Sequence, residues 1–326
     1  MIIFGAACLQ CALSYSSSAF AQIPEGRGID SQSAMYEPGP SSYLTVRGGD
    51  ILDHLAVSFS AIIDHHRRPL KLETAKTDGT KEEAFLVDDW WGADFMWAFG
   101  FFDYIQLGMV MPVVFYQDGE GHNYFTESNE EALEQGDLAA SAVRDLRLHL
   151  KGVFLRSSKD NKSDELYENG GFQMGVEAAF AFPTGDTDAY AGGRGYGIYP
   201  MLFGEYKIGM FSVAANAGAR IRTEDVNFVN LNVGHQLAFG LALAGHFTDR
   251  RVIALLDSNA LVGLMEEGQG VALEFMGGMG YIAGEDRDVM IKAGLGSGVA
   301  IGNVTAVPDI RMLIGIVYSP LAEEDW

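Results

Sequence analysis

The feature of this sequence that most constrains its fold is an alternation of apolar with polar or small residues, which recurs along most of the chain. In residues 145–151 (Asp-Leu-Arg-Leu-His-Leu-Lys), leucine occupies every second position. A helix, with about 3.6 residues per turn, would spread these leucines around its circumference, whereas a strand places them on one face. The alternation therefore predicts an all-β protein.

Twelve segments carry this pattern, and tight turns between them alternate with longer connections. The predicted strands span residues 53–64, 85–101, 105–116, 142–156, 171–183, 197–207, 210–222, 228–246, 251–264, 271–283, 289–301 and 309–319. The tight connections are 102–104, 208–209, 247–250 and 284–288, and the long ones are 65–84, 117–141 and 184–196. An even number of strands joined in this way is typical of an up-and-down antiparallel barrel.

The two faces of these strands differ in the size of their residues. One face is large and apolar, whereas the other carries small or polar residues, as in Gly175 with Glu177 or Gly218 with Arg220. A glycine-rich outer face would be unusual in a soluble sandwich, but a transmembrane barrel turns large apolar residues to lipid and has a polar or tightly filled interior. Closure also leaves no free strand edge. We therefore predict a transmembrane antiparallel β-barrel of about 12 strands over residues 51–321, with short periplasmic turns and longer extracellular loops.

Aromatic residues and the last strand support this prediction. Aromatic side chains at predicted strand ends, among them Trp91, Tyr104 and Phe247, fit the interfacial girdles of membrane barrels. The last strand contains Gly315 and ends near Tyr318, which is typical of the signal bound by the barrel-assembly machinery.

The flanking segments predict export to the bacterial outer membrane. Residues 2–13 are almost wholly apolar, and Ala19-Phe20-Ala21 matches the small-x-small pattern of a signal peptidase site. Residues 1–21 are thus predicted to be a signal peptide, 22–50 an extended periplasmic lead-in, and 322–326 a short acidic tail. The two cysteines of the sequence, Cys8 and Cys11, lie inside the predicted signal, so the trimmed chain would have no thiol chemistry.

The charge of the chain excludes nucleic acid as a partner. It carries 22 Lys and Arg against 44 Asp and Glu, a formal net charge of −22, which would repel phosphates. Many acidic residues lie in the connection 117–141, where they could gather the divalent cations that bridge lipopolysaccharide phosphates, although a solvated loop is the simpler interpretation. The expected partners are outer-membrane lipid, lipopolysaccharide, the barrel-assembly machinery and small solutes.

The candidate enzyme motifs in this sequence lack the structural context that their chemistry requires. Residues 278–283 match a dinucleotide-binding glycine pattern but lie inside a predicted strand with no helix after it. His65 and His66 are adjacent, so a strand would point them to opposite faces, away from a shared metal. We predict no enzyme activity, no cofactor and no metal site.

Charged residues on the small faces are predicted to line the lumen. Both signs occur in similar numbers, so pairs such as Lys151 with Glu177 could form between neighbouring strands. We expect a narrow or gated passage, because twelve strands lie between filled eight-stranded barrels and open porins. The predicted lumen-lining residues are Asp94, Asp145, Arg147, His149, Lys151, Glu177, Glu205, Lys207, Arg220, Arg222, Asp257, Glu274, Lys292 and Arg311.

Two known groups of outer-membrane proteins resemble parts of this chain. Residues 183–186 (Pro-Thr-Gly-Asp), followed by 192–195 (Gly-Gly-Arg-Gly), resemble the family assigned to the MetA pathway of phenol degradation. Residues 48–72, with His54, Asp64 and Arg68-Pro69-Leu70, followed by 113–119, resemble the N-terminal barrel of some OmpA-family proteins. The first resemblance implies hydrophobic or aromatic solutes, and the second implies a structural barrel.

Two hypotheses for function follow. The first is an outer-membrane channel or transporter for small solutes, with aromatic or otherwise hydrophobic ones implied by the first resemblance and with the mixed lumen charges setting its selectivity. The alternative is an OmpA-like structural barrel that stabilises the outer membrane and conducts little. An outer-membrane enzyme is disfavoured because the sequence offers no catalytic constellation.

Overall fold

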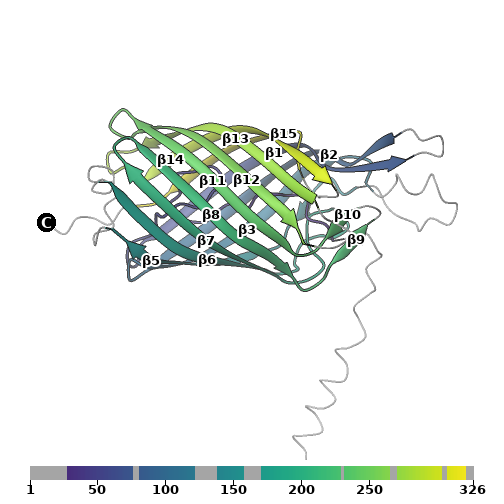
Figure 1. Ribbon diagram of the computed structural model, residues 1–326, viewed down its shortest axis with the longest axis horizontal. Coiled ribbons are helices and arrows are strands. Elements are labelled where there is room, and N and C mark those ends of the chain that lie inside the picture. The colour runs from purple at the N-terminus through teal and green to yellow at the C-terminus, as the bar shows by residue number, and fades with distance from the viewer. Residues whose placement is uncertain are drawn as a thin grey trace, which may run out of the picture.

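Twelve long strands form a closed antiparallel barrel (Figure 1). The computed structural model describes residues 28–75, 81–121, 138–157, 170–228, 231–264, 270–302 and 307–320. The barrel strands are β1 (Val57–Ala75), β2 (Lys81–Phe101), β3 (Ile105–Asp118), β5 (Arg147–Arg156), β6 (Gly171–Ala181), β7 (Gly197–Ile208), β8 (Phe211–Arg222), β11 (Gln236–Phe247), β12 (Val252–Gly263), β13 (Gly270–Ala283), β14 (Val289–Gly302) and β15 (Ile310–Tyr318). The prediction of a twelve-stranded barrel is confirmed.

Closure is achieved where β1 pairs with β15 and with β2. The ladder between β1 and β15 runs from Phe59 opposite Tyr318 to Arg67 opposite Ile310, and β2 pairs in turn with β3. The short β4 (Ala142–Val143) pairs with β3, while β9 (Val226–Phe228) and β10 (Leu231–Val233) form a separate hairpin. Within the described residues, no helix is both long and apolar enough to cross a membrane.

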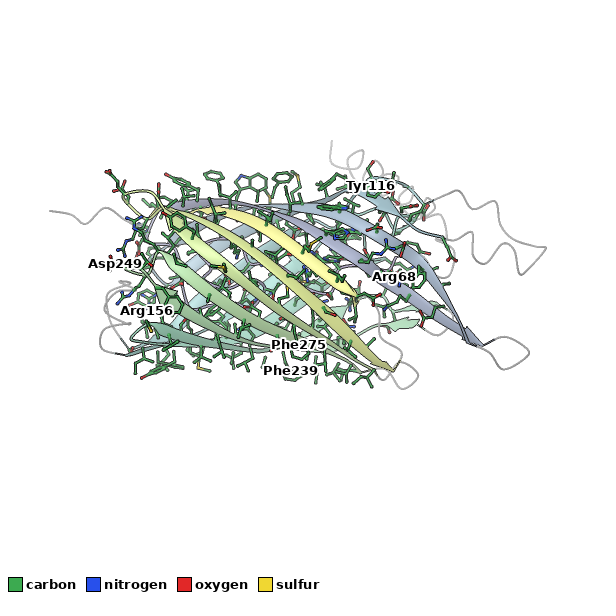
Figure 2. The ribbon with its side chains drawn as sticks, turned by 90° about the horizontal axis from the view of Figure 1, so that it is seen from above. Arg68, Tyr116, Arg156, Phe239, Asp249 and Phe275 are labelled. Atoms are coloured by element: carbon green, nitrogen blue, oxygen red, sulfur yellow. The ribbon has the colours of Figure 1, made fainter. Side chains whose placement is uncertain are left out.

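The barrel has two unlike ends. The tight β2–β3, β7–β8, β11–β12 and β13–β14 turns gather at one end, here called the turn end, where Figure 2 shows Arg156 and Asp249. The opposite end, here called the loop end, carries the longer β3–β5, β6–β7 and β8–β11 connections, with Tyr116 and Arg68 beside it (Figure 2).

The outer wall of the barrel is apolar, as the alternation predicts. On β15 exposure alternates strictly: Ile314 and Ile316 are exposed, whereas Leu313, Gly315 and Val317 face inward. Side chains such as Phe239 and Phe275 project outward from β11 and β13 (Figure 2). This continuous apolar surface suits contact with lipid acyl chains, so the barrel is of the transmembrane type.

Three strand boundaries differ from the sequence prediction. The predicted connection 65–84 is mostly strand, because β1 continues to Ala75 and β2 begins at Lys81. Charged residues on both faces hide the alternation here, and they pair instead: Arg67 lies 3.0 Å from Asp88. The predicted strand 142–156 is interrupted at residues 144–146, and the predicted strand 228–246 divides between β9, β10 and β11.

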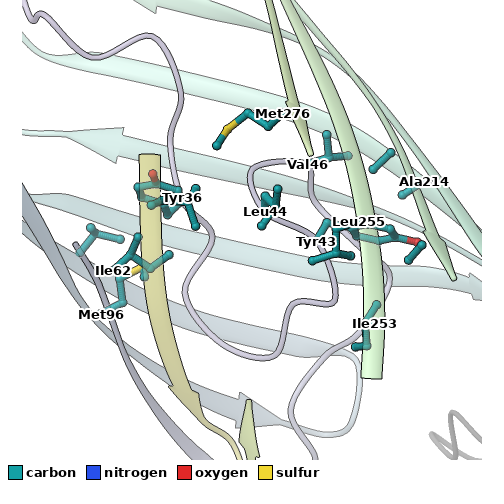
Figure 3. Packing of buried hydrophobic residues seen from close by; sticks show 14 residues of the cluster. Tyr36, Tyr43, Leu44, Val46, Ile62, Met96, Ala214, Ile253, Leu255 and Met276 are labelled. Atoms are coloured by element: carbon teal, nitrogen blue, oxygen red, sulfur yellow. The ribbon is translucent and has the colours of Figure 1, made fainter. Parts of the chain in front are cut away.

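The segment that precedes β1 lies inside the barrel. Residues 28–56, here called the lumen segment, run from the loop end, where Gly28 N donates to Thr187 O, to the turn end, where Leu55 N donates to Gly100 O. Figure 3 shows the segment winding between the walls, with Tyr43, Leu44 and Val46 against strand residues. The prediction of an extended lead-in over residues 22–50 left open whether it enters the lumen, and residues 28–50 lie inside the barrel. Its Pro, Gly and Ser content gives no periodicity that the sequence could reveal. Side chains of the wall nevertheless form hydrogen bonds with its backbone.

Candidate functional site in the barrel lumen

The predicted lumen-lining residues lie inside the barrel. All of them are buried except Arg222, which is half-buried: Asp94, Asp145, Arg147, His149, Lys151, Glu177, Glu205, Lys207, Arg220, Asp257, Glu274, Lys292 and Arg311 form the buried set. Instead of lining open water, most of them contact the lumen segment or one another. The interior is therefore a polar interface between wall and segment.

At the loop end the lumen segment is held by a buried arginine. Arg144, between β4 and β5, donates from Nη2 to both carboxylate oxygens of Asp30 at 2.8 Å, and from Nη1 to Gln32. The Asp94 carboxylate lies 3.6 Å from Arg144 and accepts from Arg147 at 2.7 Å. A bidentate contact of this kind fixes both distance and orientation.

A charged network at mid-height joins the segment to three strands. Arg311 of β15 donates to Asp64 of β1 at 2.6 Å and to Glu274 of β13 at 3.0 Å. Tyr36 of the lumen segment enters this network, because its hydroxyl donates to Asp64 at 2.5 Å and accepts from Arg311 at 2.8 Å. Two carboxylates thus accept hydrogen bonds from one buried arginine and one tyrosine hydroxyl, which gives partners to groups that would be costly to bury alone.

The turn at residues 43–47 is bound by Asp257 of β12. One oxygen of this carboxylate accepts the backbone N–H groups of Leu44, Thr45 and Val46 at 3.1, 2.8 and 3.0 Å. Lys292 of β14 donates to the Tyr43 carbonyl at 2.6 Å, on the same side of the turn. A carboxylate that accepts successive N–H groups is a strong, directional anchor.

Three further anchors of this turn come from β6, β7 and β8. Asn216 accepts from Arg47 N at 2.8 Å and donates to Arg47 O at 2.9 Å, which copies a strand pairing. The Arg47 side chain reaches Glu177 at 2.8 Å. Glu205 accepts from the Tyr43 hydroxyl and from Gly49 N, both at 2.7 Å.

The pairing partners of Lys151 and Glu177 differ from the expectation. The two residues are directly opposite in the β5–β6 register. Lys151, however, forms its ion pair with Glu37 and donates to Gly48 O and Asp50 O, while Glu177 pairs with Arg47 and with His149. The sequence prediction did not include Glu37 and Arg47, because it left open whether residues 22–50 enter the lumen.

Inward-facing glycines make room for the segment. A Cβ on Gly108 of β3 would lie 2.3 Å from the Pro38 ring, and one on Gly100 of β2 would lie 2.1 Å from Asp53 O. A Cβ on Gly278 would likewise lie 3.0 Å from the Leu44 side chain, and one on Gly294 would lie 2.9 Å from it. These glycines are the sequence signal that could have revealed an occupied lumen.

The two ends of the lumen are closed to different degrees. At the loop end an apolar cluster lies at the mouth, formed by Ile29, Leu70, Ala84, Leu86, Val87, Trp90, Val114, Ala189, Tyr190, Ala191, Val226 and Val233. At the turn end a cavity of ≈ 200 Å³ lies between the segment and the wall, bordered by Asp50, Lys207, His246 and Met290. Among the described residues, the interior is therefore more open at the turn end.

Asp145 explains the Pro-Thr-Gly-Asp and Gly-Gly-Arg-Gly motifs of the β6–β7 connection. Its carboxylate accepts from Gly185 N and from Gly193 N, both at 2.8 Å, and so ties the two ends of this loop together. Burial raises the pKa of Asp145 to about 6, although these two N–H donors oppose the rise. The motif is a loop closure at the barrel mouth.

The adjacent histidines occupy different environments, as the strand prediction requires. His65 faces outward and packs against Trp91 in a tilted arrangement, with 4.4 Å between ring centres. His66 is fully buried and packs in the same tilted way against Trp90, at 4.6 Å. Of the acidic connection 117–141, residues 122–137 lie outside the described residues.

Comparison with known proteins bears on the fold alone. No protein-family model matches the sequence, and a search of curated proteins gives no match. Neither comparison tests the resemblances to the phenol-pathway and OmpA families, which therefore stay predictions.

Solved structures nevertheless share this architecture. An outer membrane channel from Pseudomonas putida F1 aligns with a TM-score of 0.58 and 14% identity, covering 87% of this chain and 100% of that chain. The NanC porin (TM-score 0.46, 6% identity, 79% of this chain and 98% of that chain) and the KdgM porin (TM-score 0.39, 9% identity, the same coverage) are too distant to support a relationship. The chain is thus similar in fold to an outer-membrane β-barrel.

Proposed function

We propose that this protein is a channel for small solutes in the bacterial outer membrane, with the turn end in the periplasm and the lumen segment as the element that closes it. The observation that carries the proposal is the chemistry of the closure. Beside its apolar contacts, the segment is held by individual polar contacts with the wall, such as those of Asp257 and Glu205. Polar contacts of this kind can be exchanged for water, which lowers the free-energy cost of shifting the segment.

The nature of the solute is a further part of the proposal. The resemblance of residues 183–195 to the phenol-pathway family favours aromatic or otherwise hydrophobic solutes. The apolar cluster at the loop end is consistent with this, because an apolar constriction excludes water and ions more strongly than it excludes an apolar solute.

A structural barrel is the second candidate, and the filled lumen favours it. If the segment never moves, the barrel would stabilise the outer membrane and conduct little. The two candidates differ in one measurable property, which is whether loosening the segment opens a conducting path.

Substitution Asp257→Ala tests this difference. It removes the acceptor of three backbone N–H groups in the 43–47 turn. Even one hydrogen bond to a charged group contributes about 1.5 kcal/mol, so the conducting fraction should rise at least about tenfold. The measurement is single-channel current in planar bilayers, with heat-modifiable migration on gels as the check of folding.

The matched control is Asp249→Ala, at an exposed position of the β11–β12 turn (Figure 2). It removes the same charge from the turn end without touching the segment, and its current should equal that of the unchanged protein. Folded protein that stays silent in both the unchanged and the Asp257→Ala forms would instead establish the structural barrel.

A further inference from the structure

Arg220 on β8 differs from the other buried arginines in its partners. Arg147 pairs with Asp94 at 2.7 Å and Arg311 with Asp64 at 2.6 Å. Arg220 is 8% exposed, and its guanidinium donates to the backbone carbonyl of Ser33 in the lumen segment. Among the described residues, the structure pairs it with no carboxylate. A neutral carbonyl is a weaker acceptor than a carboxylate, so the charge of Arg220 is incompletely balanced.

A small cavity lies beside this guanidinium. Its volume is ≈ 40 Å³, and its lining includes the polar side chains of Arg47, Arg220, Asn216 and Asn259. The lining also includes an apolar cluster formed by Met201, Ala238, Leu261, Ala272 and Val307. The cavity is therefore amphipathic, with cationic and apolar side chains around one space.

One carboxylate also borders the cavity, but it is already bound. Glu274 accepts from Arg311 at 3.0 Å and from the Ser33 hydroxyl at 2.8 Å. Arg222, two residues after Arg220 on the same face of β8, adds a second positive charge, and its guanidinium donates to Gly234 O and Gln236 rather than to an acid. The local field on the β8 side of the cavity is thus positive.

We propose that this cavity binds small carboxylates that carry an apolar body, and that the bound carboxylate replaces the Ser33 carbonyl on Arg220. The inference rests on the proposed function, because it names the class of solute that the channel would admit. A charge-assisted contact is stronger than the neutral one it replaces, which favours the exchange. The apolar cluster offers the body of the solute a dry surface.

The size of the cavity links binding to movement of the segment. A volume of ≈ 40 Å³ holds about three water molecules, too few for a carboxylate with a hydrocarbon body. The lumen segment lines the cavity with Ser33, Ala34, Met35, Thr45 and Arg47. Residues 33–35, which include the Ser33 carbonyl that the solute replaces, must withdraw as the solute enters. Binding at Arg220 would therefore release the part of the lumen segment that lies nearest the loop end.

Equilibrium binding of benzoate to the folded, detergent-solubilised protein tests the site. Benzamide is the neutral probe of the same shape, and chloride is the small anion without an apolar body. We expect benzoate to bind at least about tenfold more tightly than benzamide or chloride, and Arg220→Gln to weaken benzoate about tenfold. Equal affinity for benzoate and benzamide, or unchanged benzoate affinity in Arg220→Gln, would overturn the proposal.

Arg251→Gln is the matched control for the charge. Arg251 also donates to backbone carbonyls, those of Ile282 and Gly284, but it lies at the turn end. Its replacement should leave benzoate affinity unchanged, and an equal loss in both variants would contradict a local site. If Arg220→Gln does not fold, the comparison of benzoate with benzamide on the unchanged protein decides the question by itself.

Withdrawal of the segment has its own readout. A cysteine placed by Ala34→Cys, at a buried position, should react faster with a water-soluble thiol reagent when benzoate is present, and benzamide should have no effect. A labelling rate that benzoate leaves unchanged would refute displacement. Channel current measured in a chloride salt distinguishes the two proposals. Current from a protein that does not bind benzoate would support the channel and overturn this inference. Benzoate binding by a protein that carries no current would support the binding site and overturn the channel.

Discussion

Strand β5 shows how differently the two faces of the barrel wall are built. Leu148 and Leu150 point outward, and Arg147, His149 and Lys151 point inward from the same ten-residue strand. The outward leucines need no individual partner, because lipid accepts any apolar shape. Each inward group instead contacts a particular acceptor, such as Asp94 for Arg147 or Glu37 for Lys151.

This difference predicts that outward-facing positions tolerate substitution better than inward-facing positions do. On the outer face the requirement is apolarity, which many residues meet. On the inner face the requirement is a fit to one segment of the same chain, in charge, in hydrogen bonding and in size. Three changes, taken in order of decreasing effect on stability, test this contrast.

The largest effect is expected at the outer face from Leu148→Arg. An arginine at this lipid-facing position should lower the free energy of unfolding from lipid vesicles by up to roughly 4 kcal/mol, because its charge would have to leave water. Leu148→Met, which stays apolar, is the control and should cost less than about 1.5 kcal/mol. Urea titration of protein refolded in vesicles measures both changes.

Strand β5 also allows a test of which side chains face the lipid and which face the lumen. Cysteines placed by Arg147→Cys and His149→Cys should be shielded from lipid-soluble thiol reagents. Preferential reaction of these two positions with the lipid-soluble reagent would reverse the assignment of inner and outer faces.

An intermediate effect is expected from a single methyl group on the inner face. Gly108→Ala would place its Cβ 2.3 Å from the Pro38 ring, so either the strand or the lumen segment must move. Overpacking of this kind typically costs about 1–3 kcal/mol. Gly277→Ala on the outer face of β13 is the control, because its Cβ would meet only the Leu256 side chain, at 3.6 Å. Equal stability of the two variants would show that the segment does not fill the space beside β3.

The contrast also explains how much of the molecule could be predicted from its sequence. Strand count and facing follow from the alternation, because each outward residue obeys a local rule that a period of two reveals. The lumen segment follows no such rule: its contacts join residues as far apart as Tyr36 and Arg311. Arg311 could be assigned to the interior from strand register, but its partner Tyr36 could not.

The smallest effect on stability, and the largest on selectivity, is expected from Arg220→Ala combined with Arg222→Ala. These side chains donate to backbone carbonyls and to Gln236, so their removal leaves no buried carboxylate without its ion pair among the described residues. Arg147→Ala, in contrast, would deprive Asp94 of its closest cation. The double variant should therefore stay folded while the lumen becomes less positive, and charge in a confined passage acts more strongly than in bulk water.

Under a KCl gradient the reversal potential should shift toward cation selectivity, whereas Arg251→Ala at the turn end should not shift it. A conducting double variant with the reversal potential of the unchanged protein would mean that solutes do not pass beside β8, and the path would then have to follow another side of the lumen segment.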